Sequence, residues 1–193
     1  MKKVLIVAVA LTIIILASFS LYLNSQRSYK VTLKYEYITN DNMNGTKINY
    51  TEFWSYQLLG IHNNTMRIIA YKTLRSYVIT INTSSRLVIG AHYLTKPQYN
   101  ITFGGIYYEP IVLFKQYKVG DTVLLLNNEP FKVVSTSNGR EVLAYYNRTE
   151  TEIQNNVFIY SSSTGYLLNG TTFYEYIGNN TRIVLYNQNI LLS

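Results

Sequence analysis

Apolar and polar side chains alternate along most of the chain after residue 23. Near the start of this region, Val31, Leu33 and Tyr35 are separated by single polar residues. A period of two places one set of side chains on a core and the other in water, as in a half-buried strand. No stretch beyond residue 23 keeps a 3.6-residue period over ten residues. The pattern therefore predicts an all-β domain.

Turn residues divide this region into short strands. The pair Asn138-Gly139 separates residues 131–136 from 141–146 and is the strongest short signal for a β-hairpin, because both residues tolerate positive φ. We count roughly eleven to thirteen strands at spacings of 8–12 residues, which is typical of an antiparallel β-sandwich or an open or closed β-barrel. Further turns are expected at residues 44–45, 83–85, 163–165 and 178–180.

The N-terminus carries a hydrophobic segment. Lys2 and Lys3 precede residues 4–23, which hold no formal charge and as a helix would span about 30 Å, the thickness of a bilayer core. Two interpretations stay open: a retained signal-anchor transmembrane helix over residues 1–23, or a signal peptide with a weak cleavage site near Ser18 and Ser20. Both predict export of residues 24–193, either as a single-pass membrane protein with an extracellular C-terminal domain or as a secreted protein.

Sequons for N-glycosylation are unusually frequent. Twenty asparagines in a chain that is about 17% serine plus threonine would give about 3.4 Asn-x-Ser/Thr triplets by chance, and the sequence has eight. This excess predicts a glycosylated extracellular domain. A chain that is simply rich in Asn and Thr is the alternative. The candidate glycosylation sites are Asn44, Asn49, Asn63, Asn82, Asn100, Asn147, Asn169 and Asn179.

Charged residues make up only 14% of the chain, and cysteine is absent. Disulfide scaffolds, thiol chemistry and cysteine-ligated metals are therefore excluded. The 15 bases and 10 acids of residues 24–193 are scattered along the sequence, which argues against nucleic-acid binding. Carboxylates titrate near pH 4, so a surface of amides and hydroxyls should change little in acid. We expect a shallow dependence of stability on pH between about 2 and 7.

Candidate catalytic groups are few. His62 lies in an expected turn and His92 in an expected strand, and neither has the partners of a hydrolytic triad or a metal site. Glu150 and Glu152 would lie on one side of a strand, whereas paired acids of glycosidases face each other across a bond. The sequence predicts no catalytic residue, no metal site, no cofactor and no enzymatic activity.

Aromatic side chains gather on one expected strand. Tyr50, Trp54 and Tyr56 share a face of the segment 48–58. Such a row binds sugars or partner proteins when it is exposed, and it fills the core when it is buried. The sequence leaves both possibilities open.

A weak internal repeat relates two parts of the domain. Residues 77–90 resemble residues 157–170 at an offset near 79. The halves, about 28–97 and 98–193, would form one continuous sheet or two packed lobes. The alternative is that all hairpin meanders look similar at this level.

Several features resemble those of exported surface proteins of thermoacidophilic archaea. They are the hydrophobic start, the sequons, the lack of cysteine and the abundance of Tyr, Ile and Asn. The segments 117–123, 131–133 and 157–168 are similar to a pattern in uncharacterised archaeal secreted β-proteins. This resemblance implies no catalytic residue, and it keeps open a filament built by strand donation. The start lacks the Gly or Ala that follows the charge in a type IV pilin leader.

Two functions follow from these observations. The first is a non-enzymatic structural or interaction glycoprotein of the cell envelope, which assembles with copies of itself or with another envelope protein through strand edges. Residues 25–38 are the expected donor strand. The alternative is a binding module that holds a sugar, lipid or peptide in a sheet-lined cavity.

Overall fold

The computed structural model describes residues 30–43, 46–73, 75–96, 111–125, 128–178 and 181–192. These residues form an antiparallel all-β fold, as the alternation predicts. The predicted N-terminal helix lies outside them. No helix in the described ranges is both long and apolar enough to cross a lipid bilayer. The strands are β1 (Lys30–Met43), β2 (Thr46–His62), β3 (Thr65–Tyr71), β4 (Ser76–Asn82), β5 (Val88–Tyr93), β6 (Thr122–Leu125), β7 (Glu129–Ser137), β8 (Arg140–Arg148), β9 (Glu152–Ser161), β10 (Leu167–Gly178) and β11 (Thr181–Leu192).

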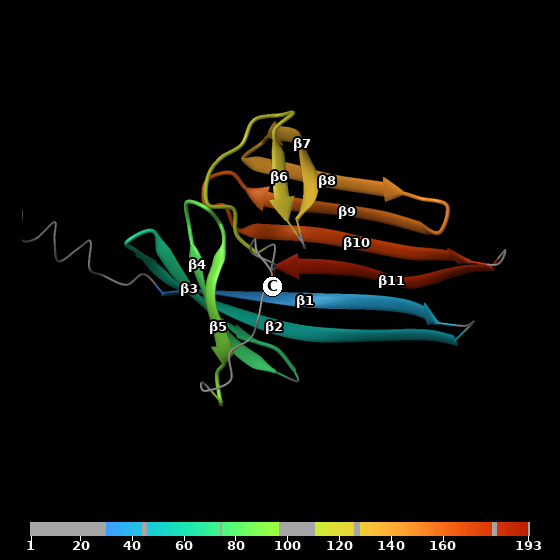
Figure 1. The fold of residues 1–193 in the computed structure, drawn as a ribbon, viewed down its shortest axis with the longest axis horizontal. Coiled ribbons are helices and arrows are strands. Elements are labelled where there is room, and N and C mark those ends of the chain that lie inside the picture. The colour runs from blue at the N-terminus through green and yellow to red at the C-terminus, as the bar shows by residue number, and fades with distance from the viewer. Residues whose placement is uncertain are drawn as a thin grey trace, which may run out of the picture.

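All eleven strands belong to one open sheet. Their order is β5-β4-β3-β2-β1-β11-β10-β9-β8-β7-β6, so two meanders meet where β11 pairs with β1. Figure 1 shows the long central strands β1, β2, β10 and β11 running together, with β5 at one end and β6 at the other turned across them. The sheet is therefore strongly curled, with β5 and β6 as its edges.

Local sequence explains the first strand and the turns. In β1, Leu33, Tyr35 and Tyr37 are buried, while Lys34 between them is exposed, as the period of two requires. Asn138 and Gly139 have φ values of 53° and 71°, the positive angles of the predicted hairpin turn.

One hydrophobic core fills the inside of the curl. It draws buried side chains from β4 near one end of the sheet and from β6 and β7 at the other, among them Ile79, Leu125 and Phe131. The core is dense in aromatic rings: Phe131 stacks on Phe158 with centroids 5.2 Å apart. The hydroxyl of the fully buried Tyr35 donates a hydrogen bond of 2.9 Å to the Leu167 carbonyl, which ties β1 to the start of β10.

A short segment before β6 completes the core. Residues 111–113 are all buried, and Val112 forms an isolated bridge with Tyr166. Leu113 donates its N–H to the Gly165 carbonyl at 2.8 Å, and Leu167 donates to the Ile111 carbonyl at 3.0 Å. Residues 111–113 therefore pair with residues 165–167 at the start of β10, where the pairing between β10 and β11 has already ended.

Two hairpins share one register. In the β4–β5 hairpin, Ile81 pairs with Val88. In the β9–β10 hairpin, Tyr160 pairs with Leu167, and both residues are 79 positions later. The next inward-facing pairs, Ile79 with Ala91 and Phe158 with Gly170, differ by the same 79.

The turns of these hairpins are also alike. Arg86 and Gly165 occupy the same place with φ values of 62° and 72°. Both hairpins then skip one residue in the ladder, Ile89 in β5 and Leu168 in β10. A skipped residue of this kind is a β-bulge, which bends the strand and increases its twist. The offset seen in the sequence thus corresponds to equal pairing and an equal bulge at these hairpins.

Candidate functional site

The candidate glycosylation sites in the described residues are spread over the sheet. Asn49 and Asn63 are exposed, and Asn82, Asn147 and Asn169 are half-buried. Asn169 points to the outer face of β10, because the neighbouring Gly170 faces the core side chain of Phe158. Asn44, Asn100 and Asn179 lie outside the described residues.

Asn63 and Asn82 lie at turns. Asn63 has φ 47° in the β2–β3 turn. The Oδ1 atom of Asn82 accepts the N–H groups of Ser84 and Ser85 at 3.0 and 2.9 Å. That arrangement leaves its Nδ2 atom, which carries the sugar in an N-linked glycan, outside the turn.

The residues considered for catalysis do not come together. His62 is exposed at the end of β2, and His92 is half-buried in β5. Glu150 lies in the β8–β9 turn, where Thr149 Oγ1 accepts the N–H of Glu152 at 3.0 Å, so the expected strand through both acids is wrong. Within the part of the chain that the structure describes, no three His, Asp or Glu side chains cluster as metal ligands would.

The aromatic row on β2 is mainly part of the core. Tyr56 is fully buried, and Trp54 lies 3.9 Å from the ring of Tyr37, centroid to centroid. Tyr50, farther along the strand, is 43% exposed. The row therefore runs from the core outward and does not form a flat exposed platform.

The first candidate site is the pair of open edges. Among the described residues, neither β5 nor β6 has a second neighbour in the sheet, and neither strand carries a Lys, Glu, Asp, Arg or Pro. Natural sheets usually protect such edges with charges, prolines or covering segments. Apolar side chains are exposed along them: Ile89 on β5 is 58% exposed and Leu124 on β6 is 37% exposed.

Arg86 joins the two ends of the sheet. It lies in the β4–β5 turn, and its Nη2 atom donates a hydrogen bond to the carbonyl of Leu124 on β6. Its Nε atom is buried without a hydrogen-bond partner. Burial raises the pKa of the core residue Tyr160 well above its usual value, and the positive charge of Arg86 opposes that shift. One arginine thus reaches from one end of the sheet to the edge strand of the other.

The directions of the strands show how an added strand could pair with the two edges. Neighbouring strands alternate in direction through all eleven positions, so β5 and β6 have the same direction along the sheet. At the centre of the sheet, β1 and β10 also share a direction, and β11 fills the position between them, antiparallel to both. A strand that paired with both β5 and β6 would therefore have the same relation to them as β11 has to β1 and β10.

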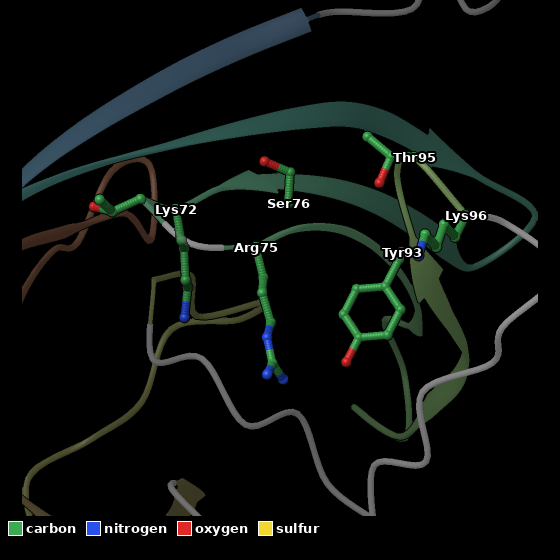
Figure 2. Close-up of a pocket in the computed structure, with 7 residues that line it drawn as sticks. Lys72, Arg75, Ser76, Tyr93, Thr95 and Lys96 are labelled. Carbon is green, nitrogen blue, oxygen red and sulfur yellow. The ribbon is translucent and has the colours of Figure 1, made fainter.

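The second candidate site is a pocket beyond the ends of β3 and β5. Its volume is about 450 Å³. Figure 2 shows Lys72 and Arg75 extending in the same direction, with the hydroxyl of Tyr93 turned to the same side. The pocket is lined by Lys72, Thr73, Arg75, Ser76, Tyr93, Thr95 and Lys96.

Aromatic rings hold one of these cations. Lys72 Nζ lies 4.0 Å from the centroid of the Trp54 ring and 5.2 Å from that of Tyr77. Cation–π contacts of this kind stabilise one orientation of the lysine side chain. Across the pocket, Leu94 donates its N–H to the Ser76 carbonyl at 2.9 Å, which fixes the chain after β5 beside the start of β4.

Comparison with protein-family models and with curated proteins finds no match for this chain.

The sequence analysis missed both Arg86 and the pocket. A signal for the pocket is present: residues 53–108 contain no Asp or Glu but hold five bases. Scattered bases in a segment without acids create a positive region once strands bring them together. Arg86 has no comparable signal, because its role depends on how far the sheet curls.

Proposed function

We propose that this protein is a non-enzymatic, exported interaction protein of the cell envelope that assembles by taking a strand from a second copy of itself between β5 and β6. The observation that carries the proposal is the polarity of the open edges. An antiparallel barrel closes only with an even number of strands, and this sheet has eleven in the described residues. One added strand, antiparallel to both edges as β11 is to β1 and β10, completes the alternation.

The edges themselves support strand addition. Backbone N–H and C=O groups along an edge pair readily with an incoming extended segment. On β6 such a segment would replace Arg86 as the partner of the Leu124 carbonyl. The exposed side chains of Ile89 and Leu124 provide apolar surface beside that backbone. In this proposal the curled sheet acts as an open barrel that an added strand closes.

The expected donor segment needs revision. Residues 30–38 belong to β1, which lies in the middle of its own sheet and pairs with both β2 and β11. Withdrawing β1 would divide the sheet into two parts. We therefore leave the donating segment of the second copy unassigned and place the accepting site at β5 and β6.

The test is self-association of the full chain with and without a charge on the edge. Analytical ultracentrifugation should show concentration-dependent oligomers for the wild type, and Ile89→Lys should reduce the association at least tenfold. Val134→Lys is the matched control, because Val134 is 52% exposed on β7, which pairs with both β6 and β8 and is not itself an edge strand.

Hydrogen exchange provides a second measurement. Backbone amides of β5 and β6 should exchange faster in the monomer than in the assembly. A chain that stays monomeric with slowly exchanging edge amides would mean that the gap is already closed from within, and the proposal would fail.

Export and glycosylation are part of the same proposal. Residues 4–23 would hold the chain in the membrane or direct its secretion, and the sequons would carry sugars on the outer side. Mass spectrometry of protein taken from its own cells tests both points. A mature chain with residues 1–23 intact, unmodified asparagines and a cytosolic location would contradict them.

A further inference from the structure

The pocket beyond β3 and β5 has the charge of an anion site. Of the seven lining residues that belong to the described ranges, Lys72, Arg75 and Lys96 are cationic and none is acidic. Like charges brought together repel one another, and a bound anion removes that cost.

The donors are arranged before any ligand arrives. Lys72 is held by the rings of Trp54 and Tyr77, and its side chain and that of Arg75 extend to the same side of the β3–β4 turn. An arginine presents a fixed planar set of N–H donors that suits an oxyanion with several acceptor oxygens. A sulfate or phosphate ester matches this set better than a halide or a single carbonyl.

The pocket is larger than a single sulfate or phosphate group. A volume of about 450 Å³ lies within the range of small-ligand sites, roughly 300–1,000 Å³. The remaining lining residues are Thr73, Ser76, Thr95 and Tyr93, each of which carries a hydroxyl group. Hydroxyls both donate and accept hydrogen bonds, as sugar hydroxyls do, and an aromatic ring covers the apolar side of a sugar.

We propose that this pocket binds a sugar that carries a sulfate or phosphate ester, with Lys72, Arg75 and Lys96 around the ester and Tyr93 beside the sugar ring. The cations of the site lie on the β3–β4 turn and beyond the end of β5, and of the edge strands only Tyr93, the last residue of β5, lines it. The proposal therefore does not depend on strand-mediated assembly.

Isothermal titration calorimetry of the full chain tests the ligand class. The probes are glucose 6-sulfate, glucose 6-phosphate, glucose and inorganic sulfate. The two sugar esters should bind at least tenfold more tightly than inorganic sulfate, glucose should show no heat of binding, and affinity for the esters should fall as salt is raised. Equal affinity for glucose and its esters would overturn the anion site, and equal affinity for sulfate and the esters would overturn the sugar.

Variants test the location. Arg75→Gln and Lys96→Gln should each weaken binding of glucose 6-sulfate about tenfold, the usual effect of losing one charged hydrogen bond. Arg67→Gln is the matched control, because Arg67 is an exposed arginine on β3 that does not line the pocket. Unchanged affinity in both pocket variants, or an equal loss in the control, would overturn the assignment. Circular dichroism of each variant checks that the fold is retained.

Discussion

Gly170 gives a direct test of core packing at the β9–β10 hairpin. A Cβ atom added there would lie 2.6 Å from Cδ1 and 3.0 Å from Cε1 of Phe158. Ordinary contact begins near 3.4 Å, so the ring must move by about 0.8 Å. Phe158 is fully buried and stacks on Phe131, so this movement disturbs a second ring.

We expect Gly170→Ala to reduce the free energy of unfolding by about 1–3 kcal/mol, the usual cost of overpacking a core. For a chain of this size the melting temperature would fall by about 2–12 °C. The substitution keeps the Asn169 sequon intact, so the variant and the wild type have the same candidate glycosylation site. Urea denaturation and thermal melting measure the change.

Gly90→Ala is the matched control. Gly90 lies on β5, and an added Cβ there would meet nothing within 4 Å. An alanine at such an open strand position should be neutral or stabilise by up to about 1 kcal/mol. Adding Phe158→Leu to Gly170→Ala should recover part of the lost stability, because the smaller side chain can give way. If the two glycine variants unfold alike, the close contact with Phe158 does not determine stability.

Three further predictions concern buried polar groups. Tyr35→Phe should cost about 1–2 kcal/mol in urea unfolding, because the buried Leu167 carbonyl loses its hydroxyl donor. Burial raises the pKa of Tyr35 and of Tyr160, so folding favours the neutral form of both side chains. The stability that results is complete below about pH 10 and should fall as the pH rises further. Melting curves from pH 8 to 11.5 measure this fall. Burial also raises the pKa of Glu129 and of Glu141, so stability should increase as the pH falls from 7 toward 4.5, and Glu141→Gln should remove part of that increase. These two carboxyl groups are the exception to the shallow pH dependence expected from the composition.

Local patterns in the sequence predict much of the fold. The alternation in β1 and the Asn138-Gly139 turn depend on neighbouring residues alone, and both have the predicted geometry. The eleven strands of the described residues also agree with the expected eleven to thirteen, because turn residues mark the strand ends. These features require no knowledge of distant parts of the chain.

The curl of the sheet could not be predicted in this way. Bulges at Ile89 and Leu168 bend the strands, and the sum of such bends brings the turn that carries Arg86 to the edge strand β6. The pocket likewise needs Lys72 and Lys96, 24 positions apart, to meet at one end of the sheet. Pairing across such distances sets both candidate sites, and local propensity contains no information about it.

The position of β11 has a consequence for the order of folding. Each meander consists of hairpins between strands that follow one another, so each can begin to form while later residues are still being synthesised. The two meanders become one sheet only through β11, whose partner β1 lies about 150 residues earlier. Closure of such a long loop is slow, and until it happens β1 and β10 expose unpaired backbone. Pairing of β11, the last described strand, with β1 is therefore the step that protects the chain from aggregation and proteolysis.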